Sequence, residues 1–217
     1  MRMRKKPNLV PRMERCARVL IKDPESHRGH WKELMPEAKA VHIELGCGKG
    51  RFTAETAAQM PDTLLIAVER VPDAMVIAME RVCAQELQNV FFIDGDAAKL
   101  PAYFAPGEVE RIYINFCDPW PGSRHAKRRL THPNFLNLYR QVLTEGGAIH
   151  FKTDNRDLFE WSLLQFPQAS FSLEAVTRDL HANGICGVMT DYEEKFHNLG
   201  TPINWCEATM EPEKTEE

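Results

Sequence analysis

Short hydrophobic runs alternate with amphipathic stretches along most of this chain. Continuous apolar runs predict buried strands over 41–45, 64–68, 90–93, 111–116 and 148–151. Apolar positions at helical spacing predict helices over 52–60, from Asp73 to about 83, and over 135–143, with Asp73 expected to cap the second of them. Two later segments, 170–176 and 202–209, are expected to close the sheet as a hairpin-like pair. This alternation predicts an α/β fold with a doubly wound parallel sheet.

The length of 217 residues fits one α/β domain. We expect a basic arm over 1–38, the main domain over 39–210 and an acidic tail over 211–217. No apolar run approaches the roughly 20 residues that cross a bilayer, and no apolar segment follows the basic start as in a secretory signal. The six cysteines form no C-x-x-C pair, so we expect no metal and a reducing, cytoplasmic setting.

Charge is distributed unevenly over a chain whose net charge is −4. Basic residues gather at the N-terminus, and a second basic run contains Arg124, His125, Lys127, Arg128 and Arg129. Such asymmetry allows an electrostatic footprint for nucleic acid on an acidic protein. The alternative is that these charges belong to solvated termini and a solvated loop.

Four carboxylates follow the ends of four successive predicted strands: Glu44, Glu69, Asp96 and Asp118. In doubly wound sheets ligands bind beyond the carboxyl ends of the strands, so these acids are expected to converge. A glycine loop from Gly46 to Gly50 follows Glu44, but Arg51 replaces the last glycine of a dinucleotide fingerprint. Converging acids repel a pyrophosphate and suit S-adenosylmethionine, which carries a sulfonium, an ammonium and one ribose. The alternative for each acid alone is a helix cap.

At this point the sequence resembles the bacterial tRNA (guanine-N7)-methyltransferases. The matching segments span residues 43 to 200 and are IELGCGKGRF (43–52), AVER (67–70), NVFFIDGDA (89–97), INFCDPWPGSRHAKRRL (114–130), FKTDN (151–155) and TDYEEKF with the following Gly200 (190–200). The first segment is common to many methyltransferases. The DPWP…KRRL and T-x-Y-E-x-K-F segments are specific to this family.

The resemblance implies a Rossmann-like class I methyltransferase sheet of seven strands with an antiparallel last strand. It implies that S-adenosylmethionine is bound by Glu44, Gly46, Glu69, Asp96 and Asp118. Asp118 also faces the reacting base as the catalytic residue. The guanine, in the variable loop of tRNA, is expected to contact Asp154, Thr190, Asp191, Tyr192 and Glu193. The tRNA is expected to contact Arg124, His125, Lys127, Arg128 and Arg129.

One position departs from the family pattern. The family usually has a lysine directly after the tryptophan-proline pair as a substrate contact, and here that position is Gly122, followed by Ser123. Arg124 or Lys127 is therefore expected to substitute for it. The protein is expected to act on tRNA without a membrane, as a monomer or a homodimer.

The chemistry implied by this substrate is methyl transfer to a neutral nitrogen. Guanine N7 has an available lone pair, so it needs no general base before it attacks. Positioning then becomes the main task, and Asp118 is expected to stabilise the positive charge that moves onto the purine. Asp154 or Glu193 is expected to accept hydrogen bonds from the N1–H and N2–H₂ edge, and Trp120 offers a stacking face for an extruded base.

These residues also have structural interpretations. Thr190 and Glu193 fit a capping box with Gly200 ending the helix, and Asp154 fits a cap for a helix that begins near Arg156. The turn at 118–121 is alternatively a rigid turn with a buried Trp120. Rival functions are methylation of an exocyclic amino group, by analogy with D-P-P-Y turns, and an RNA-binding module without catalysis. A nicotinamide dehydrogenase is disfavoured by Arg51 and the acids.

Overall fold

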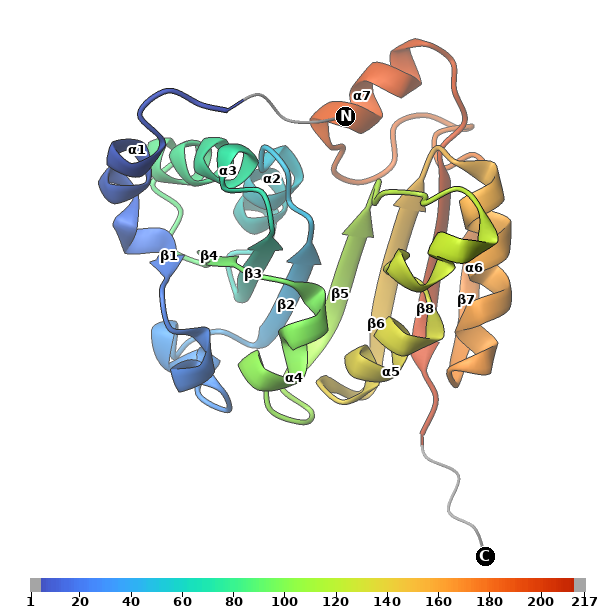
Figure 1. Cartoon of the computed structure of the whole chain (residues 1–217), viewed down its shortest axis with the longest axis horizontal. Coiled ribbons are helices and arrows are strands. Elements are labelled where there is room, and N and C mark those ends of the chain that lie inside the picture. The colour runs from blue at the N-terminus through green and yellow to red at the C-terminus, as the bar shows by residue number, and fades with distance from the viewer. Residues whose placement is uncertain (1–4, 213–217) are drawn as a thin grey trace, which may run out of the picture.

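A single mixed sheet of eight strands forms the centre of the computed structural model, which describes residues 5–212 (Figure 1). The spatial order is β1-β4-β3-β2-β5-β6-β8-β7. β8 runs antiparallel to both β6 and β7, and the remaining pairs are parallel. The strands are β1 (Leu20–Ile21), β2 (Ala40–Leu45), β3 (Thr63–Glu69), β4 (Val90–Asp94), β5 (Val109–Asn115), β6 (Leu143–Thr153), β7 (Phe171–Thr177) and β8 (Asn204–Met210).

This sheet confirms the predicted fold class and the antiparallel last strand. The seven expected strands are β2 to β8, and the two-residue β1 adds an eighth at the edge beside β4. The predicted hairpin-like pair is β7 and β8, which share an antiparallel ladder. Sequence periodicity missed β1 because two half-buried residues carry no measurable period.

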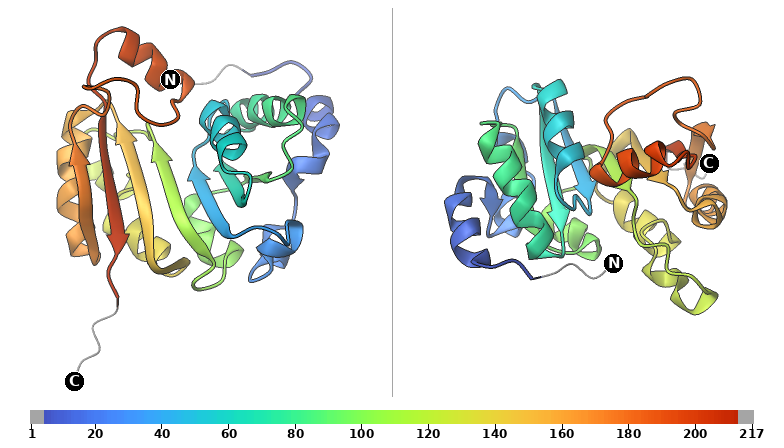
Figure 2. Two further views of the ribbon diagram at one scale, coloured as in Figure 1. Left: turned by 180° about the vertical axis from the view of Figure 1, so that it is seen from behind. Right: turned by 90° about the horizontal axis from the view of Figure 1, so that it is seen from above.

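Helices cover both faces of the sheet (Figure 2). One core packs α4, α5 and α6 against the sheet, and a second core packs α2 and α3 against the other face of β3, β4 and β5. In the described part of the chain no helix is long and apolar enough to cross a membrane. The helices are α1 (Leu9–Arg15), α2 (Arg51–Gln59), α3 (Pro72–Ala84), α4 (Leu100–Tyr103), α5 (Pro133–Arg140), α6 (Arg156–Gln168) and α7 (Asp191–Asn198).

Two local predictions need correction. Asp73 does not cap α3, because Pro72 occupies the first helical position and Val71 is therefore the capping residue. The Asp73 carboxylate instead accepts a hydrogen bond from the backbone N–H of Lys6. The helix predicted over 135–143 starts earlier, at Pro133, and ends at Arg140, because Leu143 already begins β6.

The segment before β2 packs against the domain through several buried side chains. Trp31 is fully buried in the larger core, stacks on Phe104 with 5.0 Å between ring centroids, and donates its indole N–H to the Tyr103 carbonyl at 2.8 Å. Arg12 of α1 forms an ion pair with Glu80 of α3 at 2.6 Å. The division of the chain at residue 38 stays a prediction, and residues 1–4 and 213–217, which include parts of the predicted arm and tail, lie outside the described residues.

Removal of the Trp31 side chain tests whether this segment is part of the folding unit. Trp31→Ala is expected to lower the free energy of unfolding by about 3–5 kcal/mol, because it opens a large cavity in the core. The measurement is urea denaturation followed by circular dichroism. Val10→Ala is the control, because Val10 is 64% exposed and its loss is expected to change stability by at most about 0.5 kcal/mol. Equal curves for wild type and Trp31→Ala would show that the segment is only a peripheral arm.

Candidate active site

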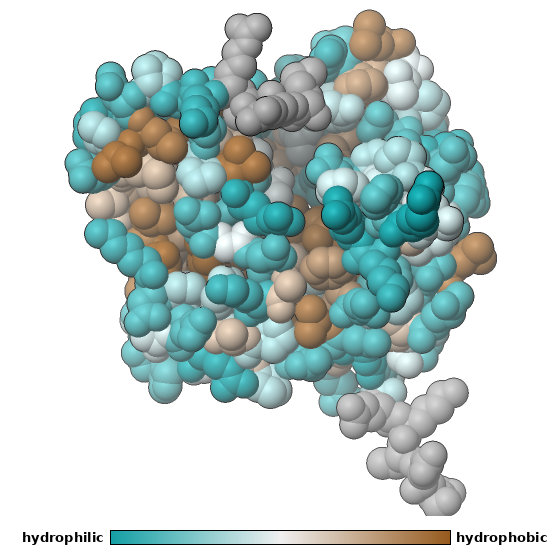
Figure 3. Space-filling view, viewed as in Figure 1, coloured by the Kyte–Doolittle hydropathy of each residue, from teal (hydrophilic) through white to brown (hydrophobic). Residues whose placement is uncertain are grey.

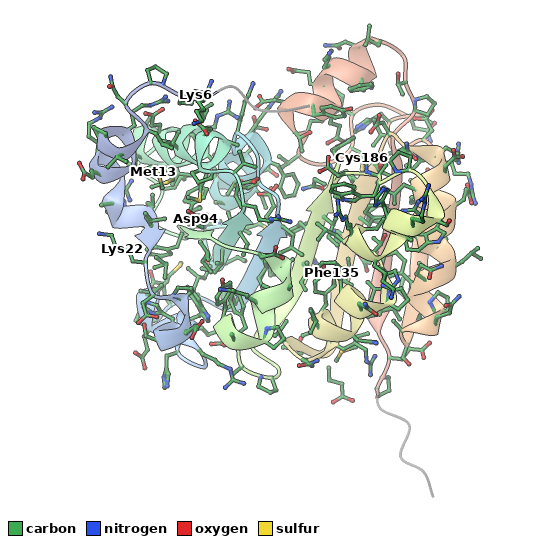
Figure 4. All side chains as sticks on the ribbon, viewed as in Figure 1. Lys6, Met13, Lys22, Asp94, Phe135 and Cys186 are labelled. Atoms are coloured by element: carbon green, nitrogen blue, oxygen red, sulfur yellow. The ribbon has the colours of Figure 1, made fainter. Side chains whose placement is uncertain are left out.

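A cavity of about 440 Å³ lies at the carboxyl ends of β2, β3, β4 and β5. Four of the predicted cofactor residues line it, namely Gly46, Glu69, Asp96 and Asp118. The turn after β5 and the start of α5 supply further wall residues: Asn115, Phe116, Cys117, Trp120, Arg128, Leu130 and Phe135. Phe135 is labelled near the middle of Figure 4, and hydrophobic residues appear near the centre of the same face in Figure 3. Three of the four strand-end acids therefore meet at one cavity, and the fourth, Glu44, does not line it.

The glycine loop after β2 serves two different purposes. Gly46 has a φ of +79°, lines the cavity, and has no atom within 4 Å of the place where a Cβ would stand. Its bare backbone therefore leaves room for a ligand. Gly50 has a φ of +74°, and a Cβ there would collide with the backbone of Ala78 in α3. The last glycine is thus required for α2 to pack closely on α3.

Glu69 is fixed by backbone donors at the end of β3. Its Oε1 accepts hydrogen bonds from the N–H groups of Arg70 and Val71, both at 2.9 Å, and its Oε2 accepts one from Gly48 at 2.9 Å. Two lone pairs on Oε1 are therefore used, and Oε2 keeps one for a ligand in the cavity. Because the donors belong to the glycine loop and the next turn, Glu69 also ties these two walls together.

Asp96 and Asp118 line the same cavity but differ in their hydrogen bonding. Asp96 accepts from the backbone N–H of Ala98 at 2.9 Å, so it caps a short 3-10 helix, and it lies 3.3 Å from Arg70. Asp118 is exposed, and no hydrogen bond or ion pair to its side chain is present among residues 5–212. It sits in a turn with two unusual backbone angles, a φ of +53° at Phe116 and +41° at Trp120. Such strain is concentrated at functional sites.

Glu44 lies beneath the cavity wall rather than in it. It is 1% exposed, accepts a hydrogen bond from the Thr53 hydroxyl at 2.6 Å, and accepts a long one from the Asn115 amide at 3.4 Å. Burial raises the pKa of Glu44 to about 7, against the lowering effect of these two hydrogen bonds. Since Asn115 lines the cavity, Glu44 reaches the site through that amide.

Two wall residues illustrate what the sequence reasoning missed. Asn115 ends β5, so the rule that site residues follow strand ends was sufficient to find it. Phe135 comes from the first turn of α5 and reaches the cavity only through the packing of that helix. Its sequence context carried no signal that separates it from an ordinary core aromatic.

The basic run occupies a 3-10 helix over Ser123–Arg128 and the residue after it. Arg124, His125, Lys127 and Arg128 are exposed. The Arg128 guanidinium lies 4.8 Å from the centre of the Trp120 ring, at the cavity wall. Arg129 points inward instead. It donates to the carbonyls of Pro119 and Trp120 at 3.0 and 3.1 Å and stacks 4.4 Å from the centre of the Trp161 ring.

The Thr190–Glu193 segment begins α7 with the capping box that the sequence indicated. The Thr190 hydroxyl accepts from the Glu193 N–H at 2.8 Å, and Glu193 accepts from the Thr190 N–H at 3.2 Å. Glu193 is completely buried, whereas Tyr192 is 46% exposed. The Tyr192 ring lies against Phe116, with 5.2 Å between centroids, and burial together with the nearby Asp154 raises the pKa of Tyr192.

Asp154 does not cap α6, because that role belongs to its neighbour. The Asn155 side chain accepts from the Leu158 N–H at 2.7 Å. Asp154 is half-buried, and within the described range its carboxylate has no hydrogen-bonded or ion-paired partner. Asp154 and Asp118 are therefore the two predicted site acids whose oxygens are free for a ligand.

The residues present fit S-adenosylmethionine. Its ribose would find an acceptor in the remaining lone pair of Glu69, and its cationic parts would find the carboxylates of Asp96 and Asp118. The half-buried Phe135 offers an apolar face that would suit the adenine ring. Between residues 5 and 212 no group of three or more histidine, cysteine or acidic side chains is placed to hold a metal.

Known proteins resemble this chain over nearly its full length. A family model described as a putative methyltransferase matches residues 38–206. The tRNA (guanine-N(7)-)-methyltransferase of Geobacillus thermodenitrificans is 45% identical, over 99% of this chain and 100% of its own. The protein of the same name from Streptococcus suis is 43% identical, over 97% of this chain and 100% of its own.

Solved structures share the fold at low sequence identity. The 16S rRNA methyltransferase KamB matches with a TM-score of 0.66 and 17% identity, over 85% of this chain and 94% of its own. A 16S rRNA (adenine(1408)-N(1))-methyltransferase from Catenulisporales acidiphilia, solved with its cosubstrate SAM, matches with a TM-score of 0.60 and 12% identity, over 91% and 95% of the two chains. Both are similar to this chain in fold.

Because the pKa of Glu44 is raised in the folded protein, the free energy of unfolding is expected to depend on pH. A carboxyl whose folded pKa is raised from 4.5 to about 7 stabilises the native state fully below pH 4.5, and this contribution is lost as the pH rises through 7. Between about pH 5 and pH 8, the unfolding free energy of the wild type is expected to fall by about 2–3 kcal/mol relative to that of Glu44→Gln.

Urea denaturation across this pH range is the measurement. The exposed Glu110 provides the matched control, since Glu110→Gln is expected to follow the wild-type curve at every pH. Parallel curves for wild type and Glu44→Gln would contradict the raised pKa.

Proposed function

The chain belongs to the family of tRNA (guanine-N7)-methyltransferases, and we propose that it transfers the methyl group of S-adenosylmethionine to N7 of a guanine in the variable loop of tRNA. The observation that carries this proposal is the unpaired, exposed Asp118 in the wall of the cavity, on the turn that is specific to the family. We place the activity in the cytoplasm, where tRNA is the expected partner.

Cofactor binding is assigned to the cavity. Glu69 accepts a hydrogen bond from the ribose, Gly46 allows close backbone approach, and Asp96 and Asp118 face the cationic part. Glu44 contributes from below through Asn115. When bound, the cofactor supplies an electrophilic methyl group on a positively charged sulfur.

The residues around the cavity position a neutral nucleophile. N7 attacks with its own lone pair, so this chain holds the base in line and does not need to remove a proton. As the reaction proceeds, positive charge moves onto the purine ring. The Asp118 carboxylate stabilises this charge, and its effect is greater in the transition state than in the ground state.

Asp154 reads the identity of the base. Its free oxygens accept from N1–H and N2–H₂ of guanine, and adenine lacks this pair of donors. Tyr192 and Phe116 offer stacking surfaces on one side, and Trp120 offers another. Thr190 and Asp191 are adjacent to Tyr192 on α7, and their contact with the base stays a prediction.

The exposed basic residues hold the tRNA backbone. The basic run comes directly after the turn at 118–121 that carries Asp118. Its exposed members therefore contact phosphates while the base enters the cavity: Arg124, His125, Lys127 and Arg128. Arg124 or Lys127 substitutes for the lysine that the family usually has at the position of Gly122. Arg129 stays a predicted RNA contact, although its guanidinium is engaged by the carbonyls of the turn.

The experiment that tests the function is incubation of the purified protein with methyl-labelled S-adenosylmethionine and unmodified tRNA. We expect the label in N7-methylguanosine after digestion to nucleosides. Label in N6-methyladenosine or another exocyclic amine would instead support the rival enzyme. Cofactor binding without any transfer would support an RNA-binding module.

Asp118→Asn is expected to lower kcat by about 10²–10³-fold, because it removes the charge that stabilises the methylated purine. Initial rates with saturating tRNA and cofactor are the measurement, and circular dichroism confirms that the fold persists. Asn keeps the size of the side chain, and Asp118 is exposed, so no loss of stability is expected. Near-normal turnover by the folded variant would remove Asp118 from the transfer step.

The double change Arg124→Ala with Lys127→Ala is expected to weaken tRNA binding and to reduce the slope of log affinity against log salt by about 1–2. Binding by the variant would neutralise fewer phosphates and would therefore release fewer counterions. Lys32→Ala with Lys39→Ala is the control, since these exposed lysines lie near the start of β2, at the opposite end from the cavity. An unchanged slope in the first pair would show that 124–127 is a solvated loop.

A further inference from the structure

α7 is attached to the rest of the molecule through acids that reach three different elements. Figure 1 shows this helix above the carboxyl end of the sheet. Each acid pairs with a lysine or an arginine, and the pairs are Asp191 with Arg81 of α3 at 3.4 Å, Glu193 with Lys152 of β6 at 3.0 Å, and Glu194 with Arg51 of α2 at 2.8 Å. The helix is thus held from both sides of the cavity.

Only the middle pair is buried. The side chains of Lys152 and Glu193 are 8% and 0% exposed, whereas both outer pairs are partly open to water. Lys152 uses its ammonium fully, donating to the Val188 carbonyl at 2.8 Å and to both Glu193 oxygens at 3.2 and 3.0 Å. Exposed ion pairs contribute little to stability, so the buried pair determines where α7 docks.

The Glu193 carboxylate has no acceptor site left for a substrate. Oε1 accepts from Lys152 and from Nε2 of His181 at 2.9 Å, and Oε2 accepts from Lys152 and from the Thr190 N–H. The Nδ1 atom of His181 accepts from the Cys186 N–H at 3.1 Å, which assigns the proton of the neutral ring to Nε2. Four donors therefore saturate the four lone-pair positions of a fully buried carboxylate.

The docking of α7 determines the position of an aromatic surface at the cavity. Tyr192 precedes Glu193 on this helix, and its ring lies against Phe116, which lines the cavity. Tyr192 also stacks on Phe196 one turn later, with 4.4 Å between centroids. If α7 moved away from β6, Tyr192 would leave Phe116, and the surface proposed for the base would open.

We propose that Lys152 is a positioning residue, which docks α7 through Glu193 and so sets Tyr192 against Phe116, and that Glu193 acts through this pair rather than by accepting a hydrogen bond from guanine. The proposal concerns the same site as the proposed function and rests on it. It leaves Asp154 as the acid that reads the base.

The test separates the charge of the pair from its docking role. Lys152→Met and Glu193→Gln each leave an uncompensated partner in the interior, so hydrogen-exchange protection of residues 191–198 is expected to fall by roughly 100-fold, and kcat with it. The double variant Lys152→Met with Glu193→Gln removes both charges and keeps an amide oxygen that can accept from His181. It is expected to recover protection and kcat to within about tenfold of the wild type.

Glu194→Gln is the matched control, because it makes the same change one residue later in an exposed pair, and it is expected to keep protection and kcat. Cofactor affinity, measured by calorimetry, is expected to be unchanged in all four variants. A double variant in which α7 is protected but turnover is absent would overturn the proposal, since the carboxylate would then be needed at the base. Wild-type protection in Glu193→Gln would overturn it as well.

The exchange measurement needs neither cofactor nor tRNA, so it distinguishes two kinds of failure. Absence of methyl transfer to tRNA by the wild type would contradict the proposed function, while the exchange data would still report whether Lys152 docks α7. Normal wild-type transfer with an undisturbed α7 in the single variants would contradict the positioning role alone.

Discussion

A carboxylate removed from water must be compensated, and this constraint organises the carboxyl edge of the sheet. Glu193 is compensated by a buried lysine, a histidine and a backbone N–H. Glu69 is compensated by backbone N–H groups, and Glu44 by a shift of its pKa toward the neutral form. Among residues 5–212, Asp118 and Asp154 have no internal partner. Glu69 keeps one lone pair on Oε2 for a ligand, so acids at the same edge of the sheet differ in how many of their lone pairs are available.

The central sheet was predictable because its strands are buried on both faces and its helices are amphipathic, so hydrophobic periodicity reports them directly. The capping box at Thr190 was predictable for a similar reason, since both of its hydrogen bonds are local. The burial of Trp31 was not, because its partners Tyr103 and Phe104 lie about 70 residues away. The predicted Asp73 cap was wrong because Pro72 occupies the first helical position, which places the cap at Val71, two residues earlier.

The cavity was predictable from topology, which brings strand ends together whatever lies between them. The state of each acid was not predictable, because it depends on donors that are distant in sequence. Nothing near Glu193 indicates that Lys152 and His181 saturate it, and nothing near Glu44 indicates its burial under Asn115. The role of Arg129 was unpredictable for the same reason. A run of basic residues does not indicate that one guanidinium donates to the carbonyls of Pro119 and Trp120.

The insertion of β8 between β6 and β7 has a consequence for synthesis on the ribosome. In the described sheet β7 pairs only with β8, so residues 171–177 have no ladder to join until residues 204–210 have emerged. α7 lies between β7 and β8 in the sequence, so the pairing of these two strands also closes the segment that contains α7. A nascent chain therefore acquires the strands that bear the cavity early and completes the side of the molecule that carries α7 last.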